Sequence, residues 1–443
     1  MKLWQKDIPV KQEVEQFTVG KDRELDLLLA PFDVLGSLAH TRMLQSINLL
    51  STEDLEVIQR ELKNIYREIE KGEFSIQPAV EDVHSQVELL LTQRIGDAGK
   101  KIHSGRSRND QVLLDLKLFI RSEIKEIVNS VNQLFQQLIT LSEAHKDKLL
   151  PGYTHLQIAM PSSFGLWFGA YAESLVDDLL MLQAAYKIAN KNPLGSAAGY
   201  GSSFPLNRQM TTDLLGFEAL NYNVVYAQMG RGKTERNVSS ALASVAATVG
   251  KLAMDATLYM NQNFGFISLP DELTTGSSIM PHKKNPDVFE IIRAKCNKLQ
   301  ALPTEIAFII GNLPSGYHRD LQLVKESFLP AFEELQSCLY MMTYMLQNVQ
   351  VKDNILQDEK YLYLFSVDAV NNQVLAGVPF REAYKNVGST IANGTFTAPE
   401  KVTHTHEGSI GNLGNDQIKS MMEQVIAGFQ FEAVDQAIAN LLT

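Results

Sequence analysis

Hydrophobic residues between Gly105 and Pro151 recur with the period of an α-helix. The stretch contains neither glycine nor proline, and its apolar residues are spaced alternately three and four positions apart, which places them on one helical face. They are Leu113, Leu116, Ile120, Ile124, Ile127, Val131, Leu134, Leu138 and Leu141. Either Asn109 or Asp110 can supply the N-cap. The pattern predicts a helix of roughly 35 residues, about 50 Å long, whose apolar face needs long partner helices.

Further segments of the chain also have the pattern of long helices. They are 162–190, 236–264, 287–302 and 320–349. Pro330 should kink the last of them. No run of alternating β-branched residues is bounded by turn residues, so few strands are expected. The predicted fold class is all-α, with a long central helical bundle at 106–354 and smaller, mostly helical domains at 1–105 and 355–443.

The composition narrows the range of partners. Of the 443 residues, 45% are hydrophobic and 21% are charged, and 40 basic residues against 51 acidic ones give a net charge of −11. A nucleic acid is not expected as a partner, because its phosphates are bound by basic surfaces. Local basic clusters can still bind a small anionic substrate.

The sequence also indicates in which cellular compartment the protein works. The first 16 residues lack the apolar core of a signal peptide, and no apolar run reaches the length of a membrane-spanning helix. The chain has two cysteines, Cys296 and Cys338, which make neither a disulfide framework nor a cysteine-based zinc site. The expected setting is therefore the cytoplasm, without a membrane partner.

Polar clusters interrupt the helical pattern where the predicted helices end. They read "EDVHSQVE" (81–88), "HSGRSRNDQV" (103–112), "PGYTHLQ" (151–157) and "TTGSSIMPHKKNPD" (274–287). In the second cluster, Arg106, Arg108 and Asn109 offer donors that suit a carboxylate. Taken alone, a helix cap with solvated arginines explains them better. His155 in the third cluster, taken alone, is better explained as a structural histidine.

The fourth cluster is a loop that leads into a helix. Gly276 and the serines after it give the loop backbone freedom, and Pro286 suits the first helical position, with Asn285 as the cap. Lys283 and the helix N-terminus add positive potential. The alternative is a surface loop whose lysines provide solubility. Several such clusters in one chain weaken that alternative but do not name a reaction.

These motifs resemble a known family. The stretch "GSSIMPHKKNPD" (276–287) is similar to the signature loop of the fumarase/aspartase superfamily. Within that superfamily, the argininosuccinate lyases are similar in "GRSRNDQV" (105–112), "PGYTHLQ" (151–157), "NPLGSAAG" (192–199) and "GVPFREA" (377–383). The resemblance covers nearly the whole chain. It implies three mostly helical domains and a homotetramer in which three subunits build each active site, so that another subunit covers much of the apolar face of the long helix.

The function implied by the resemblance is that of a carbon–nitrogen lyase, an amidine-lyase. Such an enzyme splits argininosuccinate into arginine and fumarate by anti β-elimination, a step of arginine biosynthesis. No cofactor is implied. No metal is expected either, because no group of His, Asp or Glu residues has the spacing of metal ligands along the chain.

Transferred position by position, the resemblance makes Ser277 the catalytic base, acting as an alkoxide that Lys283 and backbone N–H groups stabilise. His155 takes the position of the acid or proton relay, with Glu290 as its carboxylate partner. The implied substrate contacts are Ser37, Arg108, Asn109, Thr154, Asn285, Tyr317, Gln322 and Lys325. Asp82 and His84 fall at positions that line the pocket or support it.

The chain departs from the argininosuccinate lyase pattern at several places. His282 stands where the family has Gln, Ser104 replaces Thr, and Tyr384 replaces His. The stretch "QMGRGKTER" (228–236) replaces an Asp-Arg-Asp segment near the amino-acid end of the substrate.

Two alternatives stay open at this stage. His282 and the altered 228–236 segment would suit a lyase for another N-succinyl substrate such as adenylosuccinate. A structural protein on the same scaffold, like some lens crystallins, is the other alternative. It would predict the loss of Ser277, His155 or Lys283, and all three are present.

Overall fold

A computed structural model describes residues 11–399, 402 and 404–443. Its central element is helix α7 (Arg108–Ala144), whose 37 residues span about 55 Å. The predicted long helix is confirmed, but neither predicted N-cap is correct. The cap is Ser107, whose hydroxyl accepts a hydrogen bond from the backbone N–H of Asn109. Asp110 completes a capping box, because its carboxylate accepts from the N–H of Ser107 at 2.7 Å.

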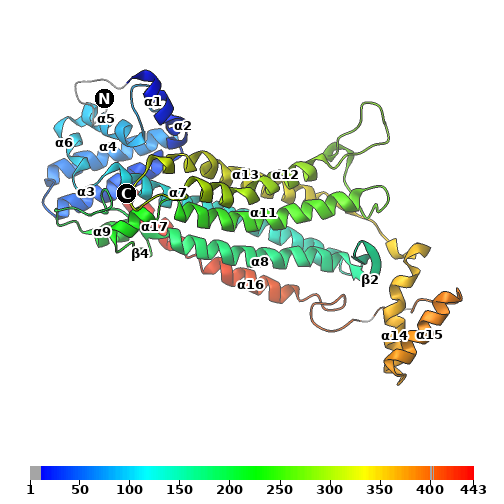
Figure 1. Ribbon diagram of the computed structural model, residues 1–443. Helices are drawn as coiled ribbons and strands as arrows, with labels where there is room; N and C mark the ends of the chain where they lie inside the picture. Colours follow the sequence, from blue (N-terminus) through cyan, green and yellow to red (C-terminus); the bar gives the residue numbers. More distant parts are fainter. Residues whose placement is uncertain (1–10, 400–401, 403) are drawn as a thin grey trace.

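Long helices lie beside α7 and build the elongated bundle seen in Figure 1. They are α8 (Phe164–Ala189), α11 (Lys233–Met260), α12 (Asp287–Ile309) and α13 (Val324–Gln347). α8 and α13 pack on α7, and α11 packs on α8 and α12. The predicted helical segments are confirmed, although α12 continues through Pro303 and α13 through Pro330.

The apolar face of α7 is covered by helices of the same chain. The nine apolar residues that form this face, from Leu113 to Leu141, are between 0% and 8% exposed. The facing apolar side chains come from α8 and α13. The expectation that another subunit covers much of this face is therefore wrong. Other large apolar side chains of the bundle helices stay exposed, namely Met254, Ile291, Phe308, Tyr340 and Tyr344.

Among the described residues, α11 is the one helix that is long and apolar enough to cross a membrane, by length and composition alone. Half of its most apolar window is buried inside the chain. Val238, Leu242 and Val245 belong to the main core. Buried core helices commonly pass the same test, so α11 is explained as a bundle helix.

The N-terminal part of the chain forms a second apolar core at one end of the bundle. Its helices are α1 (Gln12–Val19), α2 (Asp22–Asp26), α3 (Ala30–Ser46), α4 (Thr52–Glu70), α5 (Val83–Ile95) and α6 (Asp97–Lys100). α3 packs on α4 and also on α7, which joins the two cores where α7 begins.

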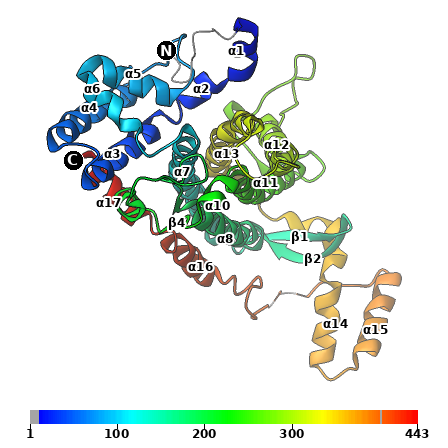
Figure 2. The same ribbon diagram turned by 60° about the vertical axis from the view of Figure 1, so that its left-hand side comes forward.

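The C-terminal part of the chain runs to the opposite end of the bundle and then returns. α14 (Ser366–Leu375) and α15 (Phe380–Ala392) pack on each other around a small core at that end. α16 (Asn415–Ala427) comes back along α8, and α17 (Phe431–Leu442) packs on α3 (Figure 2). The predicted boundaries at residues 105 and 354 stay a prediction.

Short elements fill the connections. The helices are α9 (Arg208–Leu214), α10 (Val224–Met229) and the 3-10 helices η1 (Lys101–His103), η2 (Asp271–Leu273), η3 (Arg319–Gln322), η4 (Ile355–Gln357) and η5 (Glu359–Phe365). Two pairs of strands are only two residues long, with β3 (Lys191–Asn192) parallel to β4 (Ala219–Leu220) and β5 (Ile267–Ser268) antiparallel to β6 (Gln350–Val351).

One longer hairpin was not predicted. β1 (Leu149–Thr154) pairs antiparallel with β2 (Gln157–Ser163), and Thr154 faces Gln157 across a two-residue turn. Both turn residues, His155 and Leu156, have positive φ, at 55° and 58°. That geometry is the one that suits the twist of a tight hairpin. The "PGYTHLQ" cluster is thus the tip of a hairpin that carries His155.

Candidate active site

A cavity of about 190 Å³ opens where α7 begins, between the N-terminal helices and the bundle. It brings together five of the predicted substrate contacts. These are Arg108, Asn109, Tyr317, Gln322 and Lys325. Asp82 and His84 also line it, as do residues that were not predicted as site residues, namely Asp22, Asp26, Glu81, Val112, Arg231 and Arg319.

Two arginines are held at the mouth of this cavity by acids from the start of α5. Arg108 contacts Asp82 at 3.2 Å and Glu81 at 3.4 Å. Arg319 contacts the other oxygen of Glu81 at 3.1 Å. Asp82 is fixed in turn, because it caps α5 by accepting from the N–H of Ser85. Asp82, the N-cap of α5, therefore forms an ion pair with Arg108, the first residue of α7.

Lys325 is the buried cation of the cavity. Its Nζ lies 2.6 Å from Asp22 Oδ1 and 2.8 Å from Asp26 Oδ1. Burial alone would lower the pKa of Lys325, but the charges of Asp26 and Asp22 raise it. Burial raises the pKa of Asp22 to about 6, which the charge of Lys325 only partly opposes.

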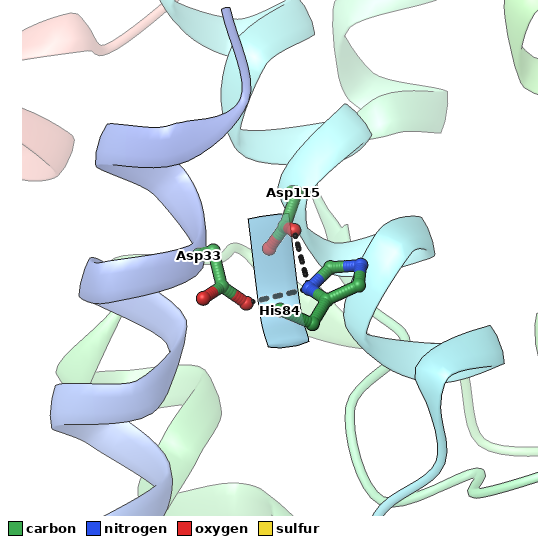
Figure 3. A group of neighbouring side chains, drawn as sticks. All are labelled: Asp33, His84 and Asp115. Atoms are coloured by element: carbon green, nitrogen blue, oxygen red, sulfur yellow. Dashed lines mark hydrogen bonds and ion pairs between the residues drawn. The ribbon is translucent and has the colours of Figure 1, made fainter. Parts of the chain in front are cut away.

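The cavity residue His84 belongs to a charged group contributed by three helices (Figure 3). His84 Nδ1 is 2.7 Å from Asp33 Oδ1 and 3.6 Å from Asp115 Oδ2, and all three residues are buried. Burial alone would lower the pKa of His84, but Asp33 and Asp115 raise it to about 9. Burial and the charge of Asp33 raise the pKa of Asp115 well above its usual value.

The same three side chains have their ligand atoms within 4.8 Å of one another, as a metal site would. Spacing along the sequence could not reveal this group, because α3, α5 and α7 each contribute one residue. The contact between His84 Nδ1 and Asp33 has the length of a charge-assisted hydrogen bond. A protonated imidazole has no free lone pair for a metal. The group therefore fits an ion-pair network better than a metal site.

Ser37, a predicted substrate contact, lies outside the cavity lining. It is fully buried on α3, and its hydroxyl accepts a hydrogen bond from Arg106 Nη1 at 3.1 Å. Arg106 is itself buried, and burial lowers its pKa. Arg106, one of the residues that seemed suited to a carboxylate, is therefore buried outside the cavity lining and hydrogen-bonded to Ser37.

The remaining predicted residues are far from the cavity in this chain. Thr154 and His155 are exposed at the hairpin tip, at the opposite end of the bundle (Figure 1). Since the cavity lies at the start of the long helix α7 and the hairpin follows its end, the two are separated by about 55 Å of helix.

Ser277 lies on the loop between η2 and α12, which projects away from the hairpin (Figures 1 and 2). Its Oγ accepts from the backbone N–H of Met280 at 3.2 Å and of Ile279 at 3.4 Å. Asn285 closes the base of the loop, with its N–H on Thr275 O and its side chain on Gly276 O.

The end of this loop differs slightly from the prediction. α12 begins at Asp287 with Pro286 as its N-cap, so the cap is not Asn285. Lys283 and Glu290 are exposed, the former on the loop and the latter in the first turn of α12. No predicted catalytic side chain lies in the cavity of its own chain.

Arg231 is a cavity residue that the motifs did not single out, although the 228–236 segment was noted as unusual. It is buried, its Nε lies 3.1 Å from Glu235 Oε1, and its Nη2 donates to Leu321 O. The next residue, Gly232, has φ 78°, and a Cβ there would lie 2.6 Å from Ile310 Cγ2. A residue with a Cβ would therefore be strained at this place and would have to displace the Ile310 side chain.

Comparison with known proteins agrees with the fold and the motifs. A family model described as lyase matches residues 6–301. The chain is 66% identical over 441 residues to the argininosuccinate lyase of Bacteroides thetaiotaomicron, across 100% of this chain and 99% of that protein. The fold is similar to an EDDS lyase variant with bound fumarate, with a TM-score of 0.75 and 20% identity over 98% of this chain and 94% of the other. A class II fumarase from Schistosoma mansoni gives a TM-score of 0.69 and 17% identity over 95% and 97% of the two chains.

Proposed function

Because this chain belongs to the argininosuccinate lyase family, we propose that it performs the elimination of that family in active sites that several copies of the chain complete together. It is a lyase that releases fumarate from argininosuccinate and leaves arginine. The proposal concerns which side chains do this and how they meet.

The reaction makes four demands on the site. A base must remove a weakly acidic proton beside a carboxylate, and positive groups must stabilise the charge that develops on that carboxylate. An acid should protonate the departing guanidino nitrogen. Both ends of the substrate must be held so that the proton and the nitrogen leave on opposite sides.

Ser277 is the proposed base. A serine hydroxyl removes a carbon-bound proton only as an alkoxide, so it needs nearby donors and positive charge. The N–H groups of Met280 and Ile279 already point at its oxygen, and Lys283 lies on the same loop. Lys283 and Asn285 would also hold the carboxylates at the fumarate end. Closure of the loop over the substrate would exclude water.

His155 is the proposed acid or proton relay, with Glu290 as its partner and Thr154 beside it. Arg108, Asn109, Tyr317, Gln322 and Lys325 hold the arginine end, because they already share one cavity. Ser37 is fully buried outside the cavity lining and hydrogen-bonded to Arg106, so it is not among the groups proposed to hold the arginine end.

The observation that carries the proposal is that these groups occupy three separate places in one chain. Five predicted substrate contacts meet in the cavity, whereas His155 is exposed on a hairpin and Ser277 is half-buried on a loop elsewhere. We therefore infer a homotetramer in which each site takes one group from each of three subunits. The exposed apolar side chains on α11, α12 and α13 are available for such contacts. The cytoplasm is the proposed compartment.

The test is the release of fumarate, followed by its ultraviolet absorbance. Purified protein is mixed with argininosuccinate and, separately, with adenylosuccinate. Fumarate from argininosuccinate alone, lost in Ser277→Ala, is the expected result. Fumarate from adenylosuccinate alone would mean that His282 and the 228–236 segment had indicated the true substrate, and no fumarate from either would reject the proposal.

A further inference from the structure

The cavity has an unusual charge pattern for a site that binds only carboxylates. Four acids, Asp22, Asp26, Glu81 and Asp82, line it together with the cations Arg108, Arg231, Arg319 and Lys325. The acids repel anionic groups of a ligand, whereas the arginines and Lys325 attract them. Alternating charges at short range suit a ligand that carries both signs, such as the end of a free α-amino acid.

Three of the four acids are already engaged by protein groups. Asp82 caps α5 and contacts Arg108. Glu81 contacts both Arg108 and Arg319. Asp26 is only 2% exposed and accepts from the N–H of Val83 as well as from Lys325.

Asp22 is the exception. Within the described part of the chain, Lys325 is the one residue that forms an ion pair with its carboxylate, at 2.6 Å, whereas Arg231 acts on Asp22 only through its charge and is itself paired with Glu235. Lys325 is shared with Asp26, so two carboxylates face one ammonium group. The trio has a net negative charge when both acids are ionised, and burial raises the pKa of Asp22 because that charge is poorly solvated. A second cation beside Asp22 would balance it.

The proposed substrate brings such a cation. Its arginine end has an ammonium group and a carboxylate on one carbon, and the predicted substrate contacts Tyr317, Gln322 and Lys325 line the cavity. We propose that Asp22 is a specificity-determining residue, which binds the α-ammonium group of the substrate while Lys325 binds the α-carboxylate beside it. The proposal rests on the proposed function, because it assigns the arginine end of the substrate to this cavity.

Inhibition of the reaction by arginine and by two analogues of arginine tests this assignment. Fumarate release is measured with three inhibitors: arginine, δ-guanidinovalerate, which lacks the ammonium group, and agmatine, which lacks the carboxylate. The proteins are the wild type, Asp22→Asn and the control Glu24→Gln, which removes an exposed acid from the same helix.

The wild type should bind arginine about ten- to a hundredfold more tightly than δ-guanidinovalerate, the range expected for one hydrogen bond to a charged group. Asp22→Asn should lose this preference by weakening the binding of arginine but not of δ-guanidinovalerate, and Glu24→Gln should keep the preference. Agmatine keeps the ammonium group and lacks only the carboxylate, so Asp22→Asn should weaken its binding as well, and an unchanged agmatine constant would argue against the contact.

Two results would overturn the proposal. If Asp22→Asn still preferred arginine over δ-guanidinovalerate as strongly as the wild type, Asp22 would not bind the ammonium group. Equal weakening of arginine and δ-guanidinovalerate would show that Asp22 acts only by holding Lys325. Asp22→Glu, which keeps the charge, should retain part of the preference, and thermal unfolding of each variant checks its fold.

A failure of the proposed function would look different. In that case the wild type releases no fumarate from argininosuccinate. Calorimetric titration with arginine and δ-guanidinovalerate, which needs no turnover, then tests Asp22 on the same proteins.

Discussion

Ser277 is the proposed catalytic base. Its oxygen already accepts two backbone N–H groups, and Ser277→Ala removes the base while leaving those donors in place. We expect the rate of fumarate release at saturating substrate to fall about 10²- to 10⁴-fold, the usual contribution of a base, with KM changed little. Ser278→Ala removes the neighbouring hydroxyl and should keep most of the activity. Equal losses in both variants would argue that the loop conformation, and not the base, had been damaged.

His84 makes a prediction about stability. Its pKa is raised to about 9 from an ordinary value near 6.5, so the protonated form is favoured by folding. The stabilisation is complete below about pH 6.5 and is lost as the pH rises through about 9. His84→Gln leaves Asp33 and Asp115 without their cation and should lower the free energy of unfolding by about 3 kcal/mol near neutral pH.

Denaturant unfolding of the wild type and His84→Gln at about pH 6 and about pH 10 measures this effect. The difference between the two proteins should shrink at the higher pH. His155→Gln changes an exposed histidine and should leave stability unchanged at both. A difference that does not depend on pH would mean that His84 stabilises the fold through packing alone.

The residues of the cavity could be predicted only where a motif contained them. Arg108 and Lys325 were found through the family resemblance, whereas Asp22 and Arg231 lie in segments with no matching motif. The His84 network was missed for a physical reason. Three helices bring its members together, and the sequence separates them by tens of residues.

At the scale of elements, the start of α11 is fixed by a glycine. Gly232 has φ 78°, and an added Cβ would meet Ile310 at 2.6 Å. Gly232→Ala should therefore cost about 2 kcal/mol of unfolding free energy and raise KM, because Arg231 precedes it in the cavity wall. Gly265→Ala is the matched control, since Gly265 also has a positive φ, 56°, but no atom within 4 Å of the added Cβ. It should cost only about 1 kcal/mol. Equal costs would show that Ile310 moves aside freely.

The helices were predictable because apolar residues that recur every three or four positions over a long segment lie on one face of an α-helix. The helix ends were less predictable. The N-cap of α7 is Ser107 and not Asn109 or Asp110, and the N-cap of α12 is Pro286 and not Asn285. The β1–β2 hairpin escaped prediction because β1 contains Pro151 and Gly152, which disfavour strands. Its turn also uses His155 and Leu156 in place of the usual Asn-Gly pair.

At the scale of the whole molecule, the sequence indicated which clusters matter but not where they lie. The structure separates the cavity, the His155 hairpin and the Ser277 loop within one chain. It also shows that the apolar face of α7 is satisfied by its own chain. In the proposed tetramer, contacts between copies therefore use other surfaces, and the exposed side chains Phe308 and Tyr340 are candidates.

If each active site is shared between subunits, two inactive variants should complement each other, which they could not do if each site lay within one chain. Ser277→Ala and His155→Gln should each be nearly inactive alone. If the two variants are unfolded together and refolded as mixed tetramers, a site can take Ser277 from one kind of chain and His155 from the other. With random mixing and equal amounts, about a quarter of the sites should be intact, and fumarate release should recover to about that fraction. Mixing without refolding is the control and should restore nothing unless subunits exchange. Light scattering of the mixture should show the mass of a tetramer. No recovery in tetramers of mixed composition would place Ser277 and His155 of each site in the same subunit, and the three-subunit arrangement would then be wrong.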